Sequence, residues 1–149
     1  MKNRQLLINI NALTAIGVVI YWILVFSGLF PVEELVPGYT EWFMSFPIAD
    51  LWIALCSGLA AIFLLKRDDK AVLFGVLAGS SLIFLGLYAF AYGYNTGQLF
   101  RVTVDEIIEI GIKIYCLSAG SFLIVQLWTQ RHTFRESSES QKVVQTVCL

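Results

Sequence analysis

The sequence has few of the residues that build metal centres and disulfide frameworks. It has one histidine, His132, among 149 residues, which argues against a histidine-based metal site. Its three cysteines, Cys56, Cys116 and Cys148, are too few and too scattered for a disulfide framework or a zinc site. We therefore expect no metal and no cofactor. No motif specifies a reaction, so the sequence assigns no catalytic residue.

Charge is also scarce. Only 14% of the residues are charged and 58% are hydrophobic, whereas a soluble domain carries about a quarter charged residues. The net charge is −1, and without a basic patch a nucleic-acid partner is not expected. Low charge combined with long apolar blocks indicates a chain whose surroundings are the lipid bilayer.

Four apolar stretches are long enough to cross a membrane, which takes about 20 residues in a helix. They cover residues 6–30, 49–65, 71–92 and 107–128. None alternates with a period of two, so helices rather than barrel strands are expected to satisfy the backbone in lipid. The first stretch is too long for a signal-peptide core and has no small-residue cleavage pattern, so we expect it to be retained. The prediction is an all-α integral membrane protein, a four-transmembrane-helix bundle over residues 1–130 with a polar tail over 131–149.

The placement of lysine and arginine predicts the orientation of this bundle. Basic residues precede the first span, fill the second loop and follow the fourth span: Lys2, Arg4, Lys66, Arg67, Lys70, Arg131, Arg135 and Lys142. The first loop has none and the third has only Arg101. By the positive-inside rule both termini and the tail are expected to be cytoplasmic. The span lengths do not distinguish a bacterial inner membrane from a eukaryotic membrane.

The third span carries a stripe of glycines, Gly75, Gly79, Gly86 and Gly93, on one narrow face of the predicted helix. Small residues allow helices in lipid to approach closely. Three interpretations stay open. The stripe packs the bundle itself, its small residues leave room for a ligand, or it docks a membrane-protein partner or a second copy of the chain.

Acidic residues gather at the predicted outer end of the bundle. Seven of the eleven lie there: Glu33, Glu34, Glu41, Asp50, Asp105, Glu106 and Glu109. Glu33 and Glu34 are in a proline-flanked loop, where we expect simple solvation. Within the fourth span Glu109 precedes Lys113 by four residues, the spacing and order that favour an intrahelical ion pair.

The candidate ligand-binding residues are Asp50, Glu109, Lys113, Glu41 and Asp105. Charged groups inside a span are costly, so they usually face the bundle interior and pair. A purely structural ion pair is one interpretation. In a second, Asp50 and Glu109 flank an outward-facing cavity for a cation or an amine-bearing amphiphile. In a third, one carboxyl acts as a general acid or base on a lipid-soluble substrate.

The segment Trp42–Leu51, which reads WFMSFPIADL, resembles the entry to the second helix of EXPERA-domain proteins. That family includes emopamil-binding sterol isomerases and sigma-2-receptor-like proteins. The resemblance implies a four-span bundle in which Asp50 binds a cationic amphiphile or stabilises a sterol intermediate. The family's partner carboxylate late in the first helix has no match in residues 25–30, and the isomerase histidines are missing. The resemblance therefore favours ligand binding and counts against sterol isomerisation.

Three functions remain open at this point. We expect a membrane protein that binds an apolar or cationic amphiphilic ligand in a carboxylate-lined pocket between helices. The alternatives are a non-catalytic accessory or assembly subunit that docks through the glycine stripe, and a membrane-embedded acid–base enzyme of the isomerase kind.

Overall fold

The computed structural model describes residues 3–34, 36–100 and 104–134, with the backbone alone at 104 and 105. All regular structure in these residues is helical, and they contain no strand. The elements are α1 (Arg4–Phe26), α2 (Tyr39–Phe43), α3 (Pro47–Lys66), α4 (Lys70–Asn95), the 3₁₀ helix η1 (Gln98–Phe100) and α5 (Val104–Thr129). The predicted all-α fold is confirmed.

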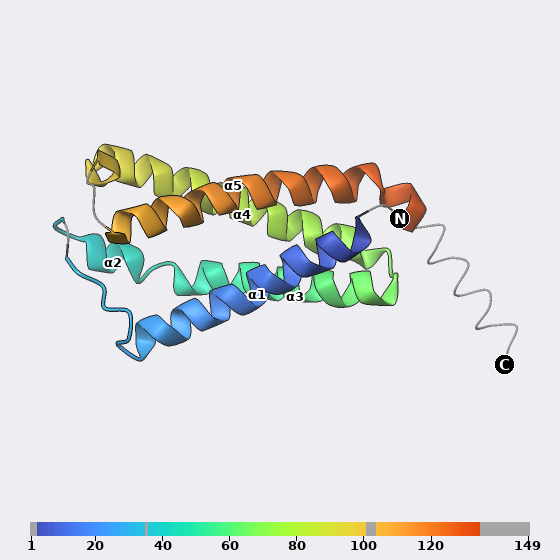
Figure 1. The fold of residues 1–149 in the computed structure, drawn as a ribbon, viewed down its shortest axis with the longest axis horizontal. Helices are drawn as coiled ribbons and strands as arrows, with labels where there is room; N and C mark the ends of the chain where they lie inside the picture. Colours follow the sequence, from blue (N-terminus) through green and yellow to red (C-terminus); the bar gives the residue numbers. More distant parts are fainter. Residues whose placement is uncertain (1–2, 35, 101–103, 135–149) are drawn as a thin grey trace, which may run out of the picture.

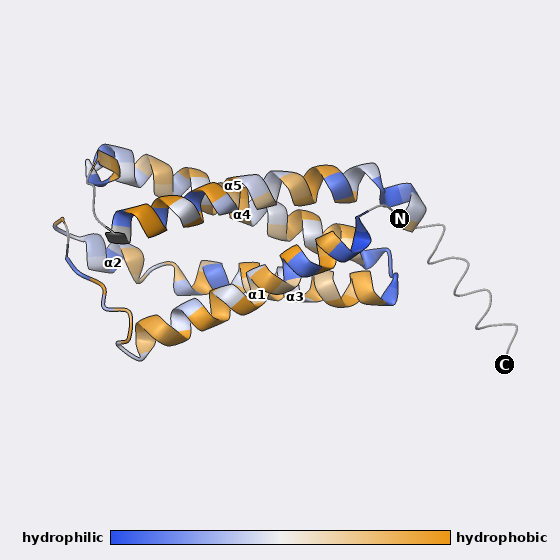
Figure 2. Cartoon of the chain, viewed as in Figure 1, coloured by the Kyte–Doolittle hydropathy of each residue, from blue (hydrophilic) through white to orange (hydrophobic). Residues whose placement is uncertain are grey.

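Four helical segments are long and apolar enough to cross a membrane: Arg4–Phe26, Tyr39–Lys66, Lys70–Asn95 and Glu106–Thr129. Hydrophobic residues run along most of their length, and hydrophilic residues are more frequent near the helix ends and connections (Figure 2). The number of spans agrees with the prediction from the sequence. The bounds differ by one to four residues, except that the second segment begins ten residues earlier, at Tyr39, because it includes α2.

The four long helices lie side by side along one axis (Figure 1). The N-terminus and the end of α5 are at one end, here called the terminal end. Helix α2 and η1 are at the other, here called the α2 end. The closest packing joins α4 to α5, α1 to α3, and α3 to α4.

The local sequence explains where the first span ends and where the second begins. Helix α1 stops at Phe26, four residues before the expected end. The chain turns at Gly28, whose φ of +76° is a left-handed conformation that glycine adopts at little cost. Helix α3 begins earlier than expected, at Pro47, because proline is preorganised for the first helical position. The short helix α2 in between was not predicted as a separate element.

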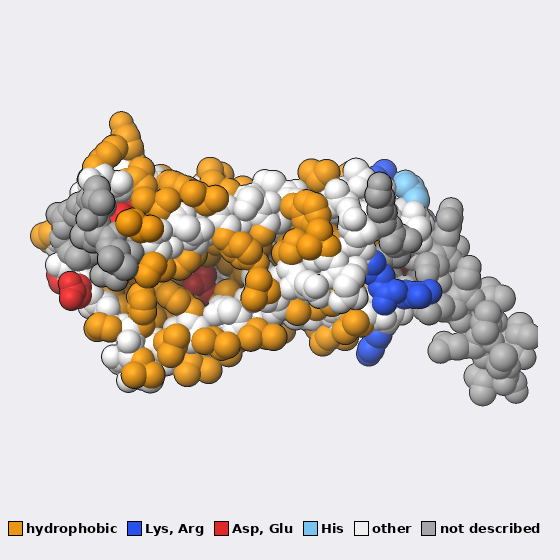
Figure 3. Space-filling model, viewed as in Figure 1, with side chains coloured by type: hydrophobic (Ala, Val, Ile, Leu, Met, Phe, Trp, Pro, Cys, Tyr) orange, Lys and Arg blue, Asp and Glu red, His pale blue; other side chains and the backbone are white. Residues whose placement is uncertain are grey.

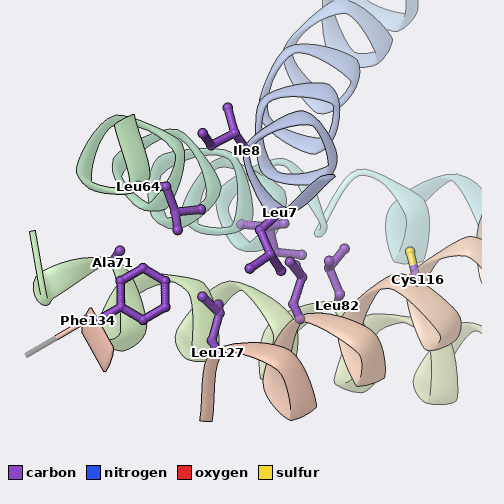
Figure 4. Close-up of a cluster of buried hydrophobic side chains, with 10 residues drawn as sticks. Leu7, Ile8, Leu64, Ala71, Leu82, Cys116, Leu127 and Phe134 are labelled. Carbon is purple, nitrogen blue, oxygen red and sulfur yellow. The ribbon is translucent and has the colours of Figure 1, made fainter. Parts of the chain in front are cut away.

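The tightest core lies at the terminal end. Leu7, Leu64, Leu127 and Phe134 are completely buried and come from three different helices and the short helical segment at residues 131–134 that follows α5. Figure 4 shows them gathered with Ala71 where the helices converge. The bundle is therefore closed by apolar packing at this end.

The glycine stripe of α4 is used inside the chain. A Cβ added at Gly79 would lie 2.9 Å from the backbone oxygen of Gly120, and one added at Gly120 would lie 2.6 Å from that of Gly79. A Cβ added at Gly86 would lie 3.0 Å from the side chain of Leu117. Gly75, Gly79, Gly86 and Gly93 are all buried. The interpretation that the stripe packs the bundle is confirmed, and α5 of the same chain occupies this face.

Candidate functional site

A cavity of about 410 Å³ lies between the helices, toward the α2 end. Its wall is made mostly by aromatic and aliphatic side chains of α1, α2, α4 and α5, and α3 contributes Asp50. The space-filling view shows a hollow with a hydrophobic rim and acidic atoms at its floor (Figure 3). The site is therefore an apolar chamber with a small number of polar groups, the usual composition of a small-molecule pocket.

Asp50 is the central polar group of this cavity. It lies in the first turn of α3, its residue surface is 8% exposed, and its Oδ2 accepts a hydrogen bond of 2.8 Å from Nε1 of Trp22. Its other oxygen, Oδ1, is buried and has no hydrogen-bond partner among the described residues. Leaving a buried acceptor unsatisfied costs about 1–3 kcal/mol, and more for a charged group. Asp50 thus presents an acceptor that the described part of the chain does not use.

Trp42 contributes a second unsatisfied group. Its indole ring lines the cavity and stacks on Tyr92, with ring centroids 3.7 Å apart and an interplanar angle of 10°. Its Nε1–H is buried and finds no acceptor in the residues that the structure describes. The cavity wall therefore includes one acceptor atom, Oδ1 of Asp50, and one donor group, Nε1–H of Trp42, that have no partner among the described residues.

The other charged side chains at the cavity, those of Glu106, Glu109 and Lys113, form a connected network on α5. Nζ of Lys113 lies 3.2 Å from Oε1 of Glu106 and 3.1 Å from Oε2 of Glu109. The hydroxyl of Tyr39 donates a 2.6 Å hydrogen bond to the other oxygen of Glu109. Glu106 and Lys113 are almost fully buried. This network uses both oxygens of Glu109 and joins α2 to α5.

The structure brings three of the five predicted site residues together. Asp50, Glu109 and Lys113 all line the cavity, and the predicted ion pair between Glu109 and Lys113 is confirmed. Glu41 is exposed on α2 and is not part of the cavity wall. The backbone of Asp105 is in the first turn of α5, but its side chain is outside the described part of the structure.

Glu34 does more than face solvent, contrary to the prediction. It is exposed, but its carboxylate accepts hydrogen bonds from the backbone N–H of Gly38 at 2.6 Å and of Thr40 at 3.0 Å. The hydroxyl of Thr40 also donates to it. Glu34 thus satisfies free donors at the start of α2.

Sequence reasoning missed Trp22, Tyr39, Trp42 and Glu106 as site residues. Trp22 is inside an apolar stretch, and Tyr39 and Trp42 are in the segment before the second one; aromatic residues at such positions are typical of membrane cores and interfaces. Glu106 had a usable signal, because it lies seven residues, or two helical turns, before Lys113 and therefore on the same face of α5. The pairing of Trp22 with Asp50 joins α1 to α3 and leaves no trace in local spacing.

Within the described residues, no group of three or more histidine, cysteine, aspartate or glutamate side chains is placed to hold a metal ion. Comparison of the chain with protein-family models, with curated proteins and with solved structures finds no match.

Proposed function

We propose that the protein is an integral membrane protein that binds a cationic amphiphile in the cavity, with the amine donating to Oδ1 of Asp50. The observation that carries this proposal is the buried carboxylate oxygen without a partner in the described structure. A protonated amine supplies both the missing donor and the opposite charge. Hydrogen bonds to charged groups contribute about 1.5–3 kcal/mol, so this one contact supports a selective interaction.

The charges around the cavity favour a cation over an anion. Among the described residues in and beside the cavity, three carboxylates, of Asp50, Glu106 and Glu109, stand against one ammonium, that of Lys113. Lys113 is already engaged by two of these carboxylates, which leaves Asp50 without a positive partner among the described side chains. Indole and phenol rings in the wall add faces on which a cation is favourable.

The apolar wall favours a ligand with a hydrophobic portion. The volume of about 410 Å³ lies in the lower part of the range of small-ligand pockets, about 300–1,000 Å³. The resemblance of Trp42–Leu51 to EXPERA-domain proteins supports the same class of ligand and the same residue, Asp50. The role of an accessory subunit docking through the glycine stripe receives less support, because α5 covers that stripe.

We propose that the termini are cytoplasmic and that the α2 end faces outward. Lysine and arginine side chains gather toward the terminal end, and acidic side chains are visible at the α2 end (Figure 3). Lys66, Arg67 and Lys70 lie in and beside the loop between α3 and α4, at the terminal end. Under the positive-inside rule this distribution supports cytoplasmic termini.

The ligand proposal is tested by binding of N,N-dimethyldodecylamine to the purified protein in lipid nanodiscs, with 1-dodecanol as the uncharged comparison. We expect the wild-type protein to bind the amine, and Asp50→Asn to bind it about 10- to 100-fold more weakly, the equivalent of one charged hydrogen bond. The asparagine keeps an acceptor for Trp22, so the fold should persist.

Glu41→Gln is the matched control, because it removes an exposed carboxylate at the same end of the bundle but outside the cavity. We expect it to bind the amine as the wild-type protein does. Equal affinity of the wild-type protein and Asp50→Asn would rule out the proposed site. Recovery of a chemically altered ligand, lost in Asp50→Asn, would instead favour the acid–base enzyme.

A further inference from the structure

We infer that the ligand enters the cavity sideways from the bilayer, through a mouth between α1 and α5, and that it carries a single apolar tail. This inference rests on the proposed function and adds the route and the shape of the ligand. It depends on where the cavity is open, where it is closed, and how deep the opening lies in the membrane.

The mouth is marked by residues that both line the cavity and are exposed. There are three: Leu13, Gly17 and Ile112. Leu13 and Gly17 belong to α1, and Ile112 belongs to α5. These two helices are not among the closely packed pairs of the bundle. Figure 3 shows the corresponding hollow on the side of the bundle, with acidic atoms at its floor.

The mouth lies at the depth of the hydrocarbon. Gly17 is 13 residues after the start of α1 at Arg4 and nine residues before its end at Phe26. At 1.5 Å per residue it is about 20 Å from one end of the helix and about 14 Å from the other. An opening at this position on a membrane-spanning helix faces lipid tails rather than water.

The α2 end of the cavity is closed by aromatic side chains. Tyr39 is 3% exposed and is tied to Glu109 by its hydroxyl. Phe43 packs on Tyr39 and on Trp22, with ring centroids 5.9 Å and 5.4 Å apart. Entry from this end would require breaking the part-buried hydrogen bond between Tyr39 and Glu109 and separating these rings, whereas the side mouth is already open.

The positions of the polar and apolar parts define the ligand. Asp50 is at the start of α3, near the α2 end, while the mouth is near the middle of α1. A head group at Asp50 therefore directs its apolar tail toward the mouth and the lipid. The modest volume of the cavity accepts one tail. The ligand class is a single-tailed amine resident in the bilayer, rather than a two-chain phospholipid.

The test is to narrow the mouth with Gly17→Leu. Apart from its own turn of α1, no atom of the described residues lies within 4 Å of a Cβ built at Gly17, so the first atom of the side chain has room and the fold should tolerate the change. Gly111→Leu is the matched control. Gly111 is exposed on α5 next to Ile112, is equally free of neighbours and does not line the cavity.

Binding rates and affinities are measured in proteoliposomes for two probes, N,N-dimethyldodecylamine and the short, water-soluble N,N-dimethylbutylamine. We expect Gly17→Leu to slow and weaken binding of the dodecyl amine by at least tenfold. The butyl amine, which lacks a long tail to accommodate, should bind as it does to the wild-type protein. Gly111→Leu should leave both probes unaffected.

The outcomes separate the route from the site. If Gly17→Leu binds the dodecyl amine like the wild-type protein while Asp50→Asn fails to bind it, the lateral route is overturned and the proposed function stands. If in addition Tyr39→Phe speeds binding, the ligand enters from the α2 end. If Asp50→Asn binds normally, both the proposed function and this inference are overturned.

Discussion

Two acidic residues of the cavity illustrate how surroundings assign roles to single residues. Glu109 has both oxygens engaged, one by Tyr39 and one by Lys113. Asp50 has one oxygen engaged by Trp22 and one without a partner in the described structure. Glu109 is thus part of the scaffold, while Asp50 is the carboxylate left with an unsatisfied acceptor. This difference is why the binding proposal rests on Asp50 alone.

The hydrogen bond from Trp22 should hold Asp50 in place. In Trp22→Phe the buried carboxylate loses its only hydrogen bond in the described structure, while phenylalanine retains an aromatic ring beside Phe43. We expect the free energy of unfolding to fall by about 1–3 kcal/mol. The measurement is reversible unfolding by SDS in mixed micelles.

Trp52→Phe provides the comparison for this prediction. Trp52 is half exposed on α3 and does not line the cavity, so its replacement should change the free energy of unfolding by less than about 0.5 kcal/mol. Equal losses in the two variants would contradict a specific role for the bond between Trp22 and Asp50.

The same residues show what sequence can predict at this scale. The pairing of Glu109 with Lys113 follows from helical spacing, because both residues lie on one helix four positions apart. The contact of Trp22 with Asp50 depends on how α1 packs against α3, which no local pattern records. Candidate residues were therefore predictable from their charge, but their hydrogen-bond partners were predictable only where both belong to the same helix.

Among the elements, α2 depends most on its surroundings. It has five residues, too few for a stable isolated helix. Its start is satisfied by the Glu34 carboxylate, and its aromatic side chains pack against Trp22 and Tyr92. Because these supports are tertiary contacts, the sequence predicted an apolar approach to the second span but not the helix itself.

The cap on α2 should depend on pH. Hydrogen bonds donated by Thr40, first from its hydroxyl and then from its backbone, hold the pKa of Glu34 below its usual value. A lowered folded-state pKa means that the cap's contribution is complete above the unfolded value of about 4.3 and is lost as pH falls through the folded value. We expect hydrogen-exchange protection of the Gly38 and Thr40 amides to decrease over that acidic range.

Glu34→Gln should reduce this protection at neutral pH and flatten its dependence on pH. The neighbouring substitution Glu33→Gln removes an exposed carboxylate that does not cap α2 and should leave the profile unchanged. If Glu34→Gln kept the acidic transition of the wild-type protein, the transition would belong to a different group.

The contact between α4 and α5 requires glycine at its centre. In Gly79→Leu the new Cβ would lie 2.9 Å from the backbone oxygen of Gly120, a group that cannot move without shifting α5. We expect a loss of about 3 kcal/mol in the free energy of unfolding, at the upper end of the usual effect of overpacking. The measurement is again unfolding in mixed micelles.

Gly111→Leu is the control for this change, because it places the same side chain on α5, where no described atom beyond its own helical turn lies within 4 Å of the new Cβ. It should leave the bundle as stable as the wild-type protein or slightly more stable, since glycine is a poor helix former. A destabilisation equal to that of Gly79→Leu would show that the effect is not specific to the α4–α5 contact.

At the scale of the molecule, the two ends of the bundle differ in packing. Large apolar side chains such as Leu127 and Phe134 fill the terminal end, whereas the cavity separates the helices toward the α2 end. Span number and approximate bounds were predictable because each span is a continuous apolar run. A pocket beside Asp50 and Glu109 was predictable from the charge of these residues, and both line the cavity. The side opening of the cavity was not predictable, because it depends on the spacing between α1 and α5, and the two helices are far apart in the sequence.

The distribution of basic residues makes a prediction about the whole chain. Alkaline phosphatase is active only outside the cytoplasm. Green fluorescent protein fluoresces when it stays in the cytoplasm, but not after the general secretory route has carried it out. With cytoplasmic termini, a fusion after Leu149 should fluoresce and lack phosphatase activity, and a fusion at Gly97, in the turn after α4, should show the reverse. The opposite pattern at both sites would invert the proposed orientation. Replacing Lys66, Arg67 and Lys70 by glutamine should weaken the preference for cytoplasmic termini, because these three residues supply the positive charge in and beside the loop between α3 and α4.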